Sequence, residues 1–522
     1  MKKEPVVFVA FQEQDNLGVG YVASILREAG FPIKMIDFRV GKERILEELQ
    51  LQRPLIVGFS IIFQYHIDVF KDLIHYLRDH GIRCHFNAGG HYPSLRHLDL
   101  LDMIPALDSI TLFEGENTFL DLARSIYAHR DWKHTQGIAY REDGLKVTNP
   151  LRPLETDLDN FPPPVRQPLK EYALGRRYAT LLAGRGCVYN CSFCSVREFY
   201  SRPPGPVKRL RRPEMVAREM ELLHEQMGCT IFMFQDDDFP VARNRGRDWV
   251  TKFCQILTDK GLPDRILWKI NCRPDEIGAE TFRMMKECGL FLVYLGIESG
   301  TDEGLRLMNK HIKAQDNLRA VEILKDLGIL YDYGFMLFDP SSTRRSILKN
   351  LDFLEAMCGD GSSPITFCKM LPYAETQIEH VLKKEGRLKG GLGFQDYDFL
   401  DLPLNDLYAF MAECFADWIG DHDGLLNMAR WARYYWAVYD KFYPQTSPSA
   451  KVDKTIQGLI SQSNRYFIDT VRRLIALFGS DRGTCDMTSL VEIKEDVAGA
   501  HSKYQKKLSR TIDRIEAMAG RK

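Results

Sequence analysis

Strand and helix signals alternate along most of this chain, in two blocks that a proline-rich stretch separates. In the first block, apolar runs such as VVFVAF (6–11) alternate with helical patterns such as DNLGVGYVASILREAG (15–30), for which Asp15 is the expected N-cap. Strands that alternate with helices of about 10–15 residues predict βαβ units and a parallel sheet. In such a sheet, the functional residues lie at the carboxyl ends of the strands.

The same alternation predicts how the chain divides into domains. After the proline-rich stretch, about six strand–helix units predict a partial (β/α)6 barrel, with helices at 213–227, 246–260, 279–287, 315–327 and 343–358. From residue 401 onward, apolar residues at helical spacing predict a helical region. The expected fold class is α/β: a Rossmann-like (flavodoxin-like) domain at 1–148, a linker at 149–178, the partial barrel at 179–400 and a C-terminal α-helical domain at 401–522.

Composition narrows the class of protein. Lys and Arg total 70 and Asp and Glu total 71, so the chain has no basic surplus of the kind that duplex nucleic acid requires. The apolar run near the N-terminus is too short for a signal peptide, and no stretch of about 18 apolar residues predicts a membrane span. We therefore expect a cytoplasmic protein without nucleic acid as a partner, whose 12 cysteines are mostly thiols.

Three of these cysteines lie within GRGCVYNCSFCSV (184–196), at the spacing C-x3-C-x2-C. Iron–sulfur clusters are held by thiolates, and a trio would hold three irons of a [4Fe–4S] cluster and leave the fourth open. A structural zinc site requires four protein ligands, and no fourth Cys or His stands nearby. The spacing therefore favours a cluster on Cys187, Cys191 and Cys194 over zinc or a redox dithiol.

With Phe193 before the last cysteine, after the first strand of a barrel-like repeat, this motif resembles that of the radical S-adenosylmethionine (SAM) enzymes. The resemblance implies that SAM binds the open iron and yields a 5′-deoxyadenosyl radical. It extends to FQDDDF (234–239), NCRP (271–274) and GIESG (296–300), which imply SAM contacts by Asp236, Asp237, Arg273, Glu298 and Ser299. The alternatives are a solvated acidic loop, a surface arginine and a buried, paired glutamate. GFMLFDPSST (334–343) and KMLPYAET (369–376) resemble two later family elements but depart from them.

The first block resembles the cobalamin-binding domain of the B12-dependent radical SAM enzymes. The stretches that carry this resemblance are QDNLG (14–18), GFSII (58–62), NAGGHYPS (87–94) and FEGEN (113–117). It implies that cobalamin lies across the strand ends, in contact with Asp15, Asn16, Leu17, Gly18, Ser60, Gly89, Gly90, Glu114, Gly115 and Glu116.

One position departs from that family's pattern. Classical B12 domains carry D-x-H-x-x-G after the first strand, and the histidine binds cobalt from below. Counting back from Gly18, Asp15 stands at the histidine position. We therefore expect cobalamin without a histidine lower ligand. The alternative is a domain that no longer binds cobalamin.

Together these resemblances imply a cobalamin-dependent radical SAM methyltransferase. It would methylate an unactivated carbon of a small, natural-product-type molecule through the 5′-deoxyadenosyl radical and methylcobalamin, with a reductant such as flavodoxin or ferredoxin. One alternative keeps both cofactors and catalyses cyclisation, ring contraction or rearrangement. Another, from a different class, is a corrinoid-binding sensor or carrier with a structural cluster. The sequence assigns no catalytic acid or base, and the C-terminal helices either pack against the barrel or close its open side.

Overall fold

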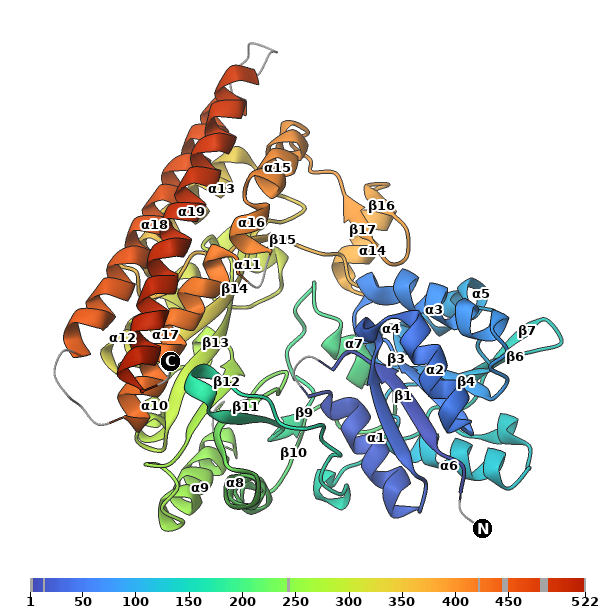
Figure 1. Ribbon diagram of the computed structural model, residues 1–522. Coiled ribbons are helices and arrows are strands. Elements are labelled where there is room, and N and C mark those ends of the chain that lie inside the picture. The colour runs from blue at the N-terminus through green and yellow to red at the C-terminus, as the bar shows by residue number, and fades with distance from the viewer. Residues whose placement is uncertain are drawn as a thin grey trace. The chain divides into compact units, whose positions relative to one another are not determined.

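The computed structural model describes residues 3–12, 15–241, 245–420, 423–443, 449–478 and 487–520 (Figure 1). The chain forms two compact units, neither of them continuous in sequence. The first unit consists of Met1–Leu169, Thr180–Met215 and Leu371–Tyr397, and the second of Lys170–Ala179, Val216–Met370 and Asp398–Lys522. The cysteine loop therefore belongs to the same unit as the N-terminal block. The three boundaries between the four segments expected from the sequence remain predictions.

The first unit contains a parallel sheet in the order β2-β1-β3-β4-β5, as in flavodoxin-like folds, which confirms the predicted fold class. Two antiparallel strands, β6 and β7, extend it beyond β5. The strands are β1 (Val6–Ala10), β2 (Ile33–Asp37), β3 (Ile56–Ser60), β4 (His85–Gly89), β5 (Ser109–Thr111), β6 (Ile138–Glu142) and β7 (Leu145–Thr148). The helices are α1 (Leu17–Glu28), α2 (Lys42–Gln52), α3 (Ile67–Asp79), α4 (His91–Leu95), α5 (His97–Met103) and α6 (Glu116–Tyr127).

Helices cover both faces of this sheet. Every residue of β1 is apolar and buried, and since successive side chains of a strand point to opposite faces, each face needs a covering layer. Val7 and Val9 join the core formed with α2, α3 and α4. Val6, Phe8 and Ala10 join the core formed with α1 and α6. With helices on both faces, the carboxyl edge of the strands is left as the place for a ligand.

The later segments of the first unit are mostly loops. The cysteine loop follows the first strand of a short antiparallel pair and leads into a helix, and the second strand of the pair comes after that helix. The segment 371–397 adds a helix and a small hairpin. The elements are β9 (Gly184–Arg185), α7 (Val196–Ser201), β10 (Arg209–Leu210), α14 (Gln377–Lys384), β16 (Leu388–Gly390) and β17 (Gln395–Tyr397).

The second unit is built on a parallel sheet that confirms the predicted partial barrel. Among the described residues the strand order is β15-β14-β13-β12-β11-β8, with β8 (Arg177–Leu181), β11 (Cys229–Phe234), β12 (Leu267–Cys272), β13 (Leu290–Glu298), β14 (Leu330–Phe338) and β15 (Cys368–Lys369). The connecting helices are α8 (Pro213–Met227), α9 (Arg245–Asp259), α10 (Ala279–Glu287), α11 (Asp302–Leu307), α12 (Ala314–Asp326) and α13 (Arg344–Cys358).

The C-terminal region is helical, as predicted. Its long helices α17, α18 and α19 pack on one another, and α18 also packs on α13 (Figure 1). The helices are α15 (Pro403–Cys414), α16 (Ala416–Ile419), α17 (Leu425–Phe442), α18 (Ser449–Phe478) and α19 (Met487–Met518).

Candidate cofactor-binding sites

The three clustered cysteines lie in the loop between β9 and α7. The side chains of Cys187, Cys191 and Cys194 are partly exposed, and the amide of Cys194 donates to the carbonyl of Cys191 at 3.1 Å. Phe193, which stands between Cys191 and Cys194 in the sequence, is half-buried. Within the described ranges, no group of three or more His, Cys, Asp or Glu side chains has the arrangement needed to hold a metal ion.

The donor set of this loop fits an iron–sulfur cluster. Between Gly184 and Val196 the sequence contains three thiols and neither histidine nor carboxylate. Thiolates are the usual ligands of such clusters, and three of them leave one iron for a further ligand. A structural zinc site would need a fourth ligand that this loop does not supply.

A group of ion pairs ties the start of the cysteine loop to the N-terminal sheet. Nη1 of Arg185, two residues before Cys187, lies 3.1 Å from Oε1 of Glu114, and its Nη2 lies 2.6 Å from Oε1 of Glu116. Nη2 of Arg209 also lies 2.8 Å from Oε1 of Glu114. Burial alone would raise the pKa of Glu114, but the guanidinium groups of Arg209 and Arg185 lower it, so the carboxyl stays ionised.

These carboxylates are among the residues predicted to contact cobalamin, and in this structure they have arginine partners. Gly115, between them, follows β5. A Cβ at Gly115 would lie 3.2 Å from Cγ2 of Thr111, the last residue of that strand. The loop after β5 therefore packs on its own strand and on the cysteine loop.

Two more of the predicted cobalamin contacts end neighbouring strands. Ser60 ends β3, and its Cα is in register with that of Gly89 at the end of β4. Beside them, the hydroxyl of Thr111 is buried without a hydrogen-bond partner among the described residues. Small residues and a buried hydroxyl that needs a partner fit a ligand with its own polar groups, such as the amide-bearing rim of a corrinoid.

The backbone conformation at Gly90 requires glycine, independently of any ligand. Its φ is +112°, and a Cβ there would lie 2.8 Å from the carbonyl oxygen of Ile61. Side chains rarely adopt that φ, and the backbone atom cannot move aside cheaply. The turn out of β4 therefore requires glycine at this position, with or without a ligand.

Asp15, at the position where the family pattern has histidine, is engaged within the first unit. Its carboxylate forms an ion pair with Arg166 and accepts a hydrogen bond from the hydroxyl of Thr180 at 3.1 Å. Its φ of +70° takes it out of the helix, and Asn16 caps α1 by accepting from the amide of Val19 at 3.1 Å. The prediction that Asp15 is the N-cap is wrong, because Arg166 and Thr180 hold its carboxylate.

The next two predicted contacts begin α1. Leu17 is buried, whereas Gly18 is exposed and a Cβ there would meet only Oδ1 of Asn16, at 3.6 Å. Gln14, the first residue of the QDNLG stretch, lies outside the described residues. The helix start is thus open at Gly18.

In the second unit, the residues predicted to contact SAM follow neighbouring parallel strands. Asp236 and Asp237 follow β11, and the first is buried while the second is exposed. The side-chain amide of Asn271, in β12, donates to the carbonyl of Asp236 at 3.0 Å. The acidic loop is therefore fixed to the next strand and only partly solvated.

Arg273 and Glu298 meet through Lys310. Arg273 is buried, which excludes the alternative of a surface arginine, and its Nη2 donates to the carbonyl of Lys310 at 2.5 Å. Nζ of Lys310 lies 3.7 Å from Oε1 of Glu298. Burial raises the pKa of Glu298, and Lys310 and Arg273 only partly oppose that rise. Glu298 also has a φ of +63°, a conformation uncommon outside glycine and often found at functional sites.

Ser299 supports the turn after β13. Its buried hydroxyl lies 3.4 Å from Oδ1 of Asn350, which also accepts from the amide of Gly300 at 2.8 Å. Nδ2 of Asn317 donates to the carbonyl of Ser299 at 3.1 Å. Sequence reasoning missed Lys310, Asn317 and Asn350, which stand in no motif and reach the turn only through the fold.

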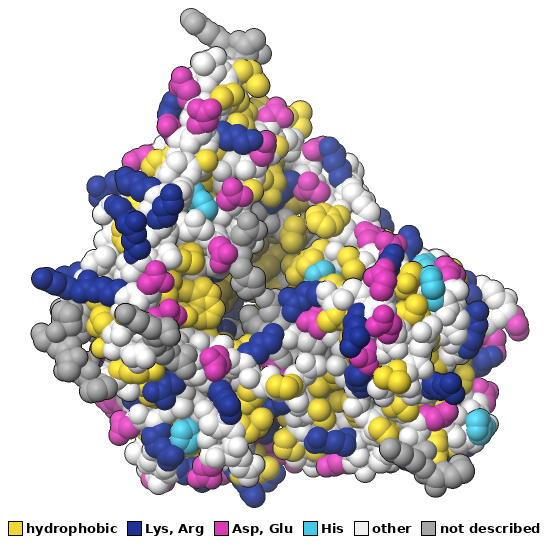
Figure 2. Space-filling model, viewed as in Figure 1, with side chains coloured by type: hydrophobic (Ala, Val, Ile, Leu, Met, Phe, Trp, Pro, Cys, Tyr) yellow, Lys and Arg dark blue, Asp and Glu magenta, His cyan; other side chains and the backbone are white. Residues whose placement is uncertain are grey.

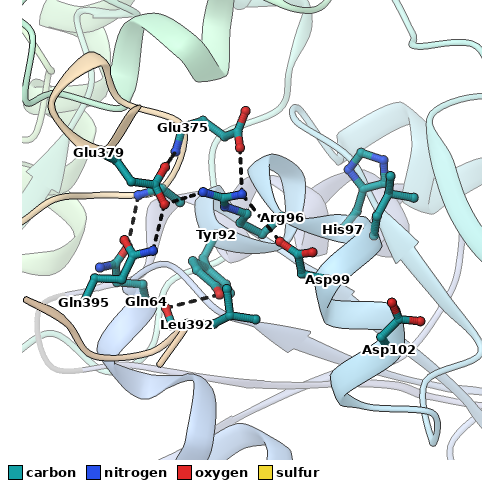
Figure 3. A network of polar contacts seen from close by, with 12 residues as sticks. Gln64, Tyr92, Arg96, His97, Asp99, Asp102, Glu375, Glu379, Leu392 and Gln395 are labelled. Carbon is teal, nitrogen blue, oxygen red and sulfur yellow. Dashed lines mark hydrogen bonds and ion pairs between the residues drawn. The ribbon is translucent and has the colours of Figure 1, made fainter. Parts of the chain in front are cut away.

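The segment 371–397 is held by polar contacts to the segments that follow β3 and β4 (Figure 3). Arg96, between α4 and α5, lies with its Nη1 2.9 Å from Oε1 of Glu375 and also pairs with Glu379. Oε1 of Gln64 accepts from the amide of Ala374 at 3.1 Å. Glu375 stands in the KMLPYAET stretch, so this motif is attached to the N-terminal sheet.

Family models match both parts of the chain. The model of the radical SAM superfamily matches residues 181–354, and that of the B12 binding domain matches residues 4–123. Together the two matches cover more than half of the chain. The chain is a B12-binding radical SAM enzyme. The cofactors of these two domains are a [4Fe–4S] cluster, SAM and cobalamin, and the thiol trio and the strand edge described above fit them.

Curated relatives of this B12-binding radical SAM enzyme include methyltransferases and a cyclase. An uncharacterized methyltransferase of Pyrococcus horikoshii is 27% identical over 69% of this chain and 77% of its own length. The hopanoid C-3 methylase of Methylococcus capsulatus is 26% identical over 76% of this chain and 75% of its own length. The anaerobic magnesium-protoporphyrin IX monomethyl ester cyclase of Rubrivivax gelatinosus is 26% identical over 61% of this chain, which spans 58% of the cyclase.

Solved structures show the same fold. The cobalamin-dependent SAM radical enzyme OxsB, with aqua-cobalamin bound, superposes with a TM-score of 0.68 at 17% identity, over 99% of this chain and 84% of OxsB. The methyltransferase TsrM of Kitasatospora setae, with cobalamin and a [4Fe–4S] cluster, gives 0.61 at 17% identity, over 73% of this chain and 75% of TsrM. The fold similarity to OxsB thus extends through the C-terminal helices of this B12-binding radical SAM enzyme.

The visible surface agrees with the balanced composition. Lys and Arg side chains are interspersed with Asp and Glu over the face shown in Figure 2. Among the described helices, none has the length and apolar character needed to cross a membrane.

Proposed function

We propose that this enzyme is a methyltransferase that places a methyl group on an unactivated carbon of a small molecule. The cofactors would supply the chemistry: a 5′-deoxyadenosyl radical from one SAM, and a methyl group carried by cobalamin from a second. The radical would abstract hydrogen from the substrate, and the substrate radical would take the methyl group. The electrons balance when each turnover takes two from a reductant such as flavodoxin or ferredoxin, one to cleave SAM and one to reduce cobalamin after it has lost the methyl group. Cys187, Cys191 and Cys194 would hold the cluster.

The observation that carries the proposal is the link between the cysteine loop and the cobalamin-type sheet edge. Both belong to the first unit, and Arg185 beside Cys187 pairs with Glu114 and Glu116 at the end of β5. A radical formed at the cluster and a methyl group on cobalt must both reach one substrate carbon, which requires that the two cofactors be held close together. The ion pairs supply such a link.

Methyl transfer is favoured over rearrangement by the relatives. The methyltransferase of P. horikoshii and the hopanoid methylase align over larger shares of this chain than the cyclase does. The second candidate, a reaction with both cofactors and no methyl transfer, is supported by the cyclases and by the 4′-phospho-dehydrooxetanocin synthase of Priestia megaterium, which is 26% identical over 65% of this chain.

The test uses the full chain, reconstituted anaerobically with iron, sulfide and hydroxocobalamin, then given SAM and a strong reductant. Mass spectrometry measures 5′-deoxyadenosine and methylcobalamin. The proposal expects both, and expects a Cys191→Ala variant to form no 5′-deoxyadenosine.

Three results would contradict the proposal in different ways. 5′-Deoxyadenosine without cobalt methylation would favour the rearrangement. Cobalamin binding without any SAM cleavage would favour a corrinoid sensor or carrier with a structural cluster. A chain that does not bind cobalamin would place the N-terminal domain among those that have lost their ligand.

A further inference from the structure

A group of charged side chains lies on one face of the sheet in the second unit. Tyr294 of β13 has Asn271 of β12 and Asp332 of β14 as its register partners. Register partners on parallel strands point to the same face, and Lys269, two residues before Asn271, shares it. The opposite face carries Trp268, whose ring packs on α9. Lys269, Tyr294 and Asp332 therefore face away from that helix layer.

Helix α17 brings further polar groups to Asp332. Nη1 of Arg433 lies 3.0 Å from Oδ1 of Asp332, and the hydroxyl of Tyr434 donates to Oδ2. Nε of Arg430 lies 3.8 Å from Oδ1, too far for a hydrogen bond. Arg433 and Tyr434 thus satisfy the carboxylate, and Arg430 remains beside it. We call Lys269, Tyr294, Asp332, Arg430 and Arg433 the Asp332 cluster.

Positive charge in the Asp332 cluster exceeds the negative charge available to it. Nε of Arg430 is buried and has no acceptor among the described residues. Burial lowers the pKa of Lys269 to about 8, more than the carboxylates of Asp332 and Asp236 raise it. A lysine and an arginine are therefore held out of water with incomplete compensation, which is costly unless a further anion joins them.

Tyr294 adds a neutral donor to these cations. Its side chain is 39% exposed, and in the part of the chain that the structure describes its hydroxyl has no hydrogen-bond partner. Burial, with a smaller contribution from Glu298, raises the pKa of Tyr294, so the phenol keeps its proton. A Cβ at Gly334 would lie 3.2 Å from this hydroxyl, and the glycine leaves it uncovered.

We propose that the Asp332 cluster binds an oxyanion, a carboxylate or a phosphate, that the substrate carries. Lys269 and Arg430 would supply charge-assisted hydrogen bonds and Tyr294 a neutral one. Asp332, already bonded to Arg433 and Tyr434, would hold α17 and thus Arg430 in place. This inference rests on the proposed function, since the oxyanion belongs to the molecule that is methylated, and it narrows the substrate to an anionic one.

The test measures how inorganic phosphate and propionate bind to the reconstituted full chain, by saturation-transfer NMR for propionate and phosphorus line broadening for phosphate. The variants are Lys269→Met and Arg430→Met. Lys441→Met is the matched control, because Lys441 lies on the same helix with a side chain 27% exposed against 23% for Arg430, and with a similarly loose ion pair of 3.9 Å. Lys269→Arg keeps the charge.

We expect both Met variants to weaken binding of at least one of the anions by about tenfold or more, since each loses a charge-assisted hydrogen bond. Lys441→Met should bind as the wild type does, and Lys269→Arg should regain part of the loss. Equal affinity in the wild type and all four variants, or binding of neither anion to the wild type, would overturn the proposal.

The carboxylate of SAM is the other source of the same chemistry, and a second readout separates the two. Half-saturating SAM for 5′-deoxyadenosine formation, measured without substrate, should be the same in the wild type and in Lys269→Met. A raised value in that variant would assign the cluster to SAM and overturn the substrate proposal. Failure of cobalt methylation in the wild type would instead contradict the proposed function and leave the anion measurement interpretable.

Discussion

At the scale of single residues, Arg185 is the side chain that joins the cysteine loop to the N-terminal sheet. Arg185→Met should destabilise the protein by about 3–5 kcal/mol, because it leaves the buried carboxylate of Glu116 without its partner. Urea unfolding measures the loss. Arg197→Met, at a partly exposed arginine of α7, is the control and should cost under about 0.5 kcal/mol.

A second change tests the reason for that loss. Adding Glu116→Gln to Arg185→Met removes the unpaired charge, so part of the stability should return. Arg185→Met unfolding at the same urea concentration as the wild type would show that the ion pairs do not hold the loop.

His91, the residue after Gly90, makes stability depend on pH. Its ring stacks on Phe199 at a centroid distance of 4.0 Å, and burial lowers its pKa to about 4. The unfolded chain, with a pKa near 6.5, takes up the proton first, so this contribution is complete above about pH 6.5 and is lost as the pH falls toward 4. Between pH 7.5 and 5.5 the loss should be about 1.3 kcal/mol.

His91→Phe keeps an aromatic ring on Phe199 and removes the titration. Urea midpoints of the variant should therefore fall less between those two pH values than those of the wild type. The same fall in both proteins would mean that His91 titrates freely in the folded state.

The residue at position 15 leads to a prediction about the ligands of cobalt. Since Arg166 and Thr180 hold its carboxylate, and no imidazole stands at that position, bound cob(II)alamin should give an electron paramagnetic resonance spectrum without nitrogen splitting. Splitting that persists in His91→Phe would reveal the cofactor's own base as the ligand, and splitting lost in that variant would reveal His91.

At the scale of elements, the turn after β13 depends on a close approach. A Cβ on Gly300 would lie 2.3 Å from Cγ of Phe353 in α13. Gly300→Ala should therefore cost about 1–3 kcal/mol by overpacking, and Phe353→Leu should relieve part of that cost. Gly278→Ala is the control, because a Cβ there meets no atom within 4 Å. Equal urea midpoints for the two alanine variants would contradict the packing described.

Element type was readable from the sequence where the apolar pattern is strong. The predicted helices at 213–227 and 279–287 match α8 and α10 at both ends, because Pro213 starts the first and Gly289 follows the second. The antiparallel pair β6–β7 was not predicted, since its outer strand β7 is only four residues long and mostly exposed. Helix α11 was not predicted either. It is only six residues long, and it begins at its N-cap, Thr301.

At the scale of the whole molecule, the sequence showed which motifs belong together but not how the chain returns on itself. The segment 371–397 belongs to the first unit through contacts such as Arg96 with Glu379, which lie 283 residues apart. No local pattern encodes a pairing at that separation. For the same reason Lys310, Asn317 and Asn350 could not be recognised from the sequence as neighbours of GIESG. The thiol trio lies within one short loop, and its assignment as the cluster ligands stays a prediction from local spacing.

The measurement that tests the central claim most directly follows the methyl group. The reconstituted full chain is incubated with reductant, hydroxocobalamin and SAM whose methyl group is deuterated. Mass spectrometry then measures the masses of the cobalamin and nucleoside products. A methyltransferase that uses both domains predicts a deuterated methyl group on cobalt and 5′-deoxyadenosine in the same sample, the latter lost in Cys191→Ala. 5′-Deoxyadenosine beside unmethylated cobalamin would contradict that claim and leave a B12-binding radical SAM enzyme of another reaction.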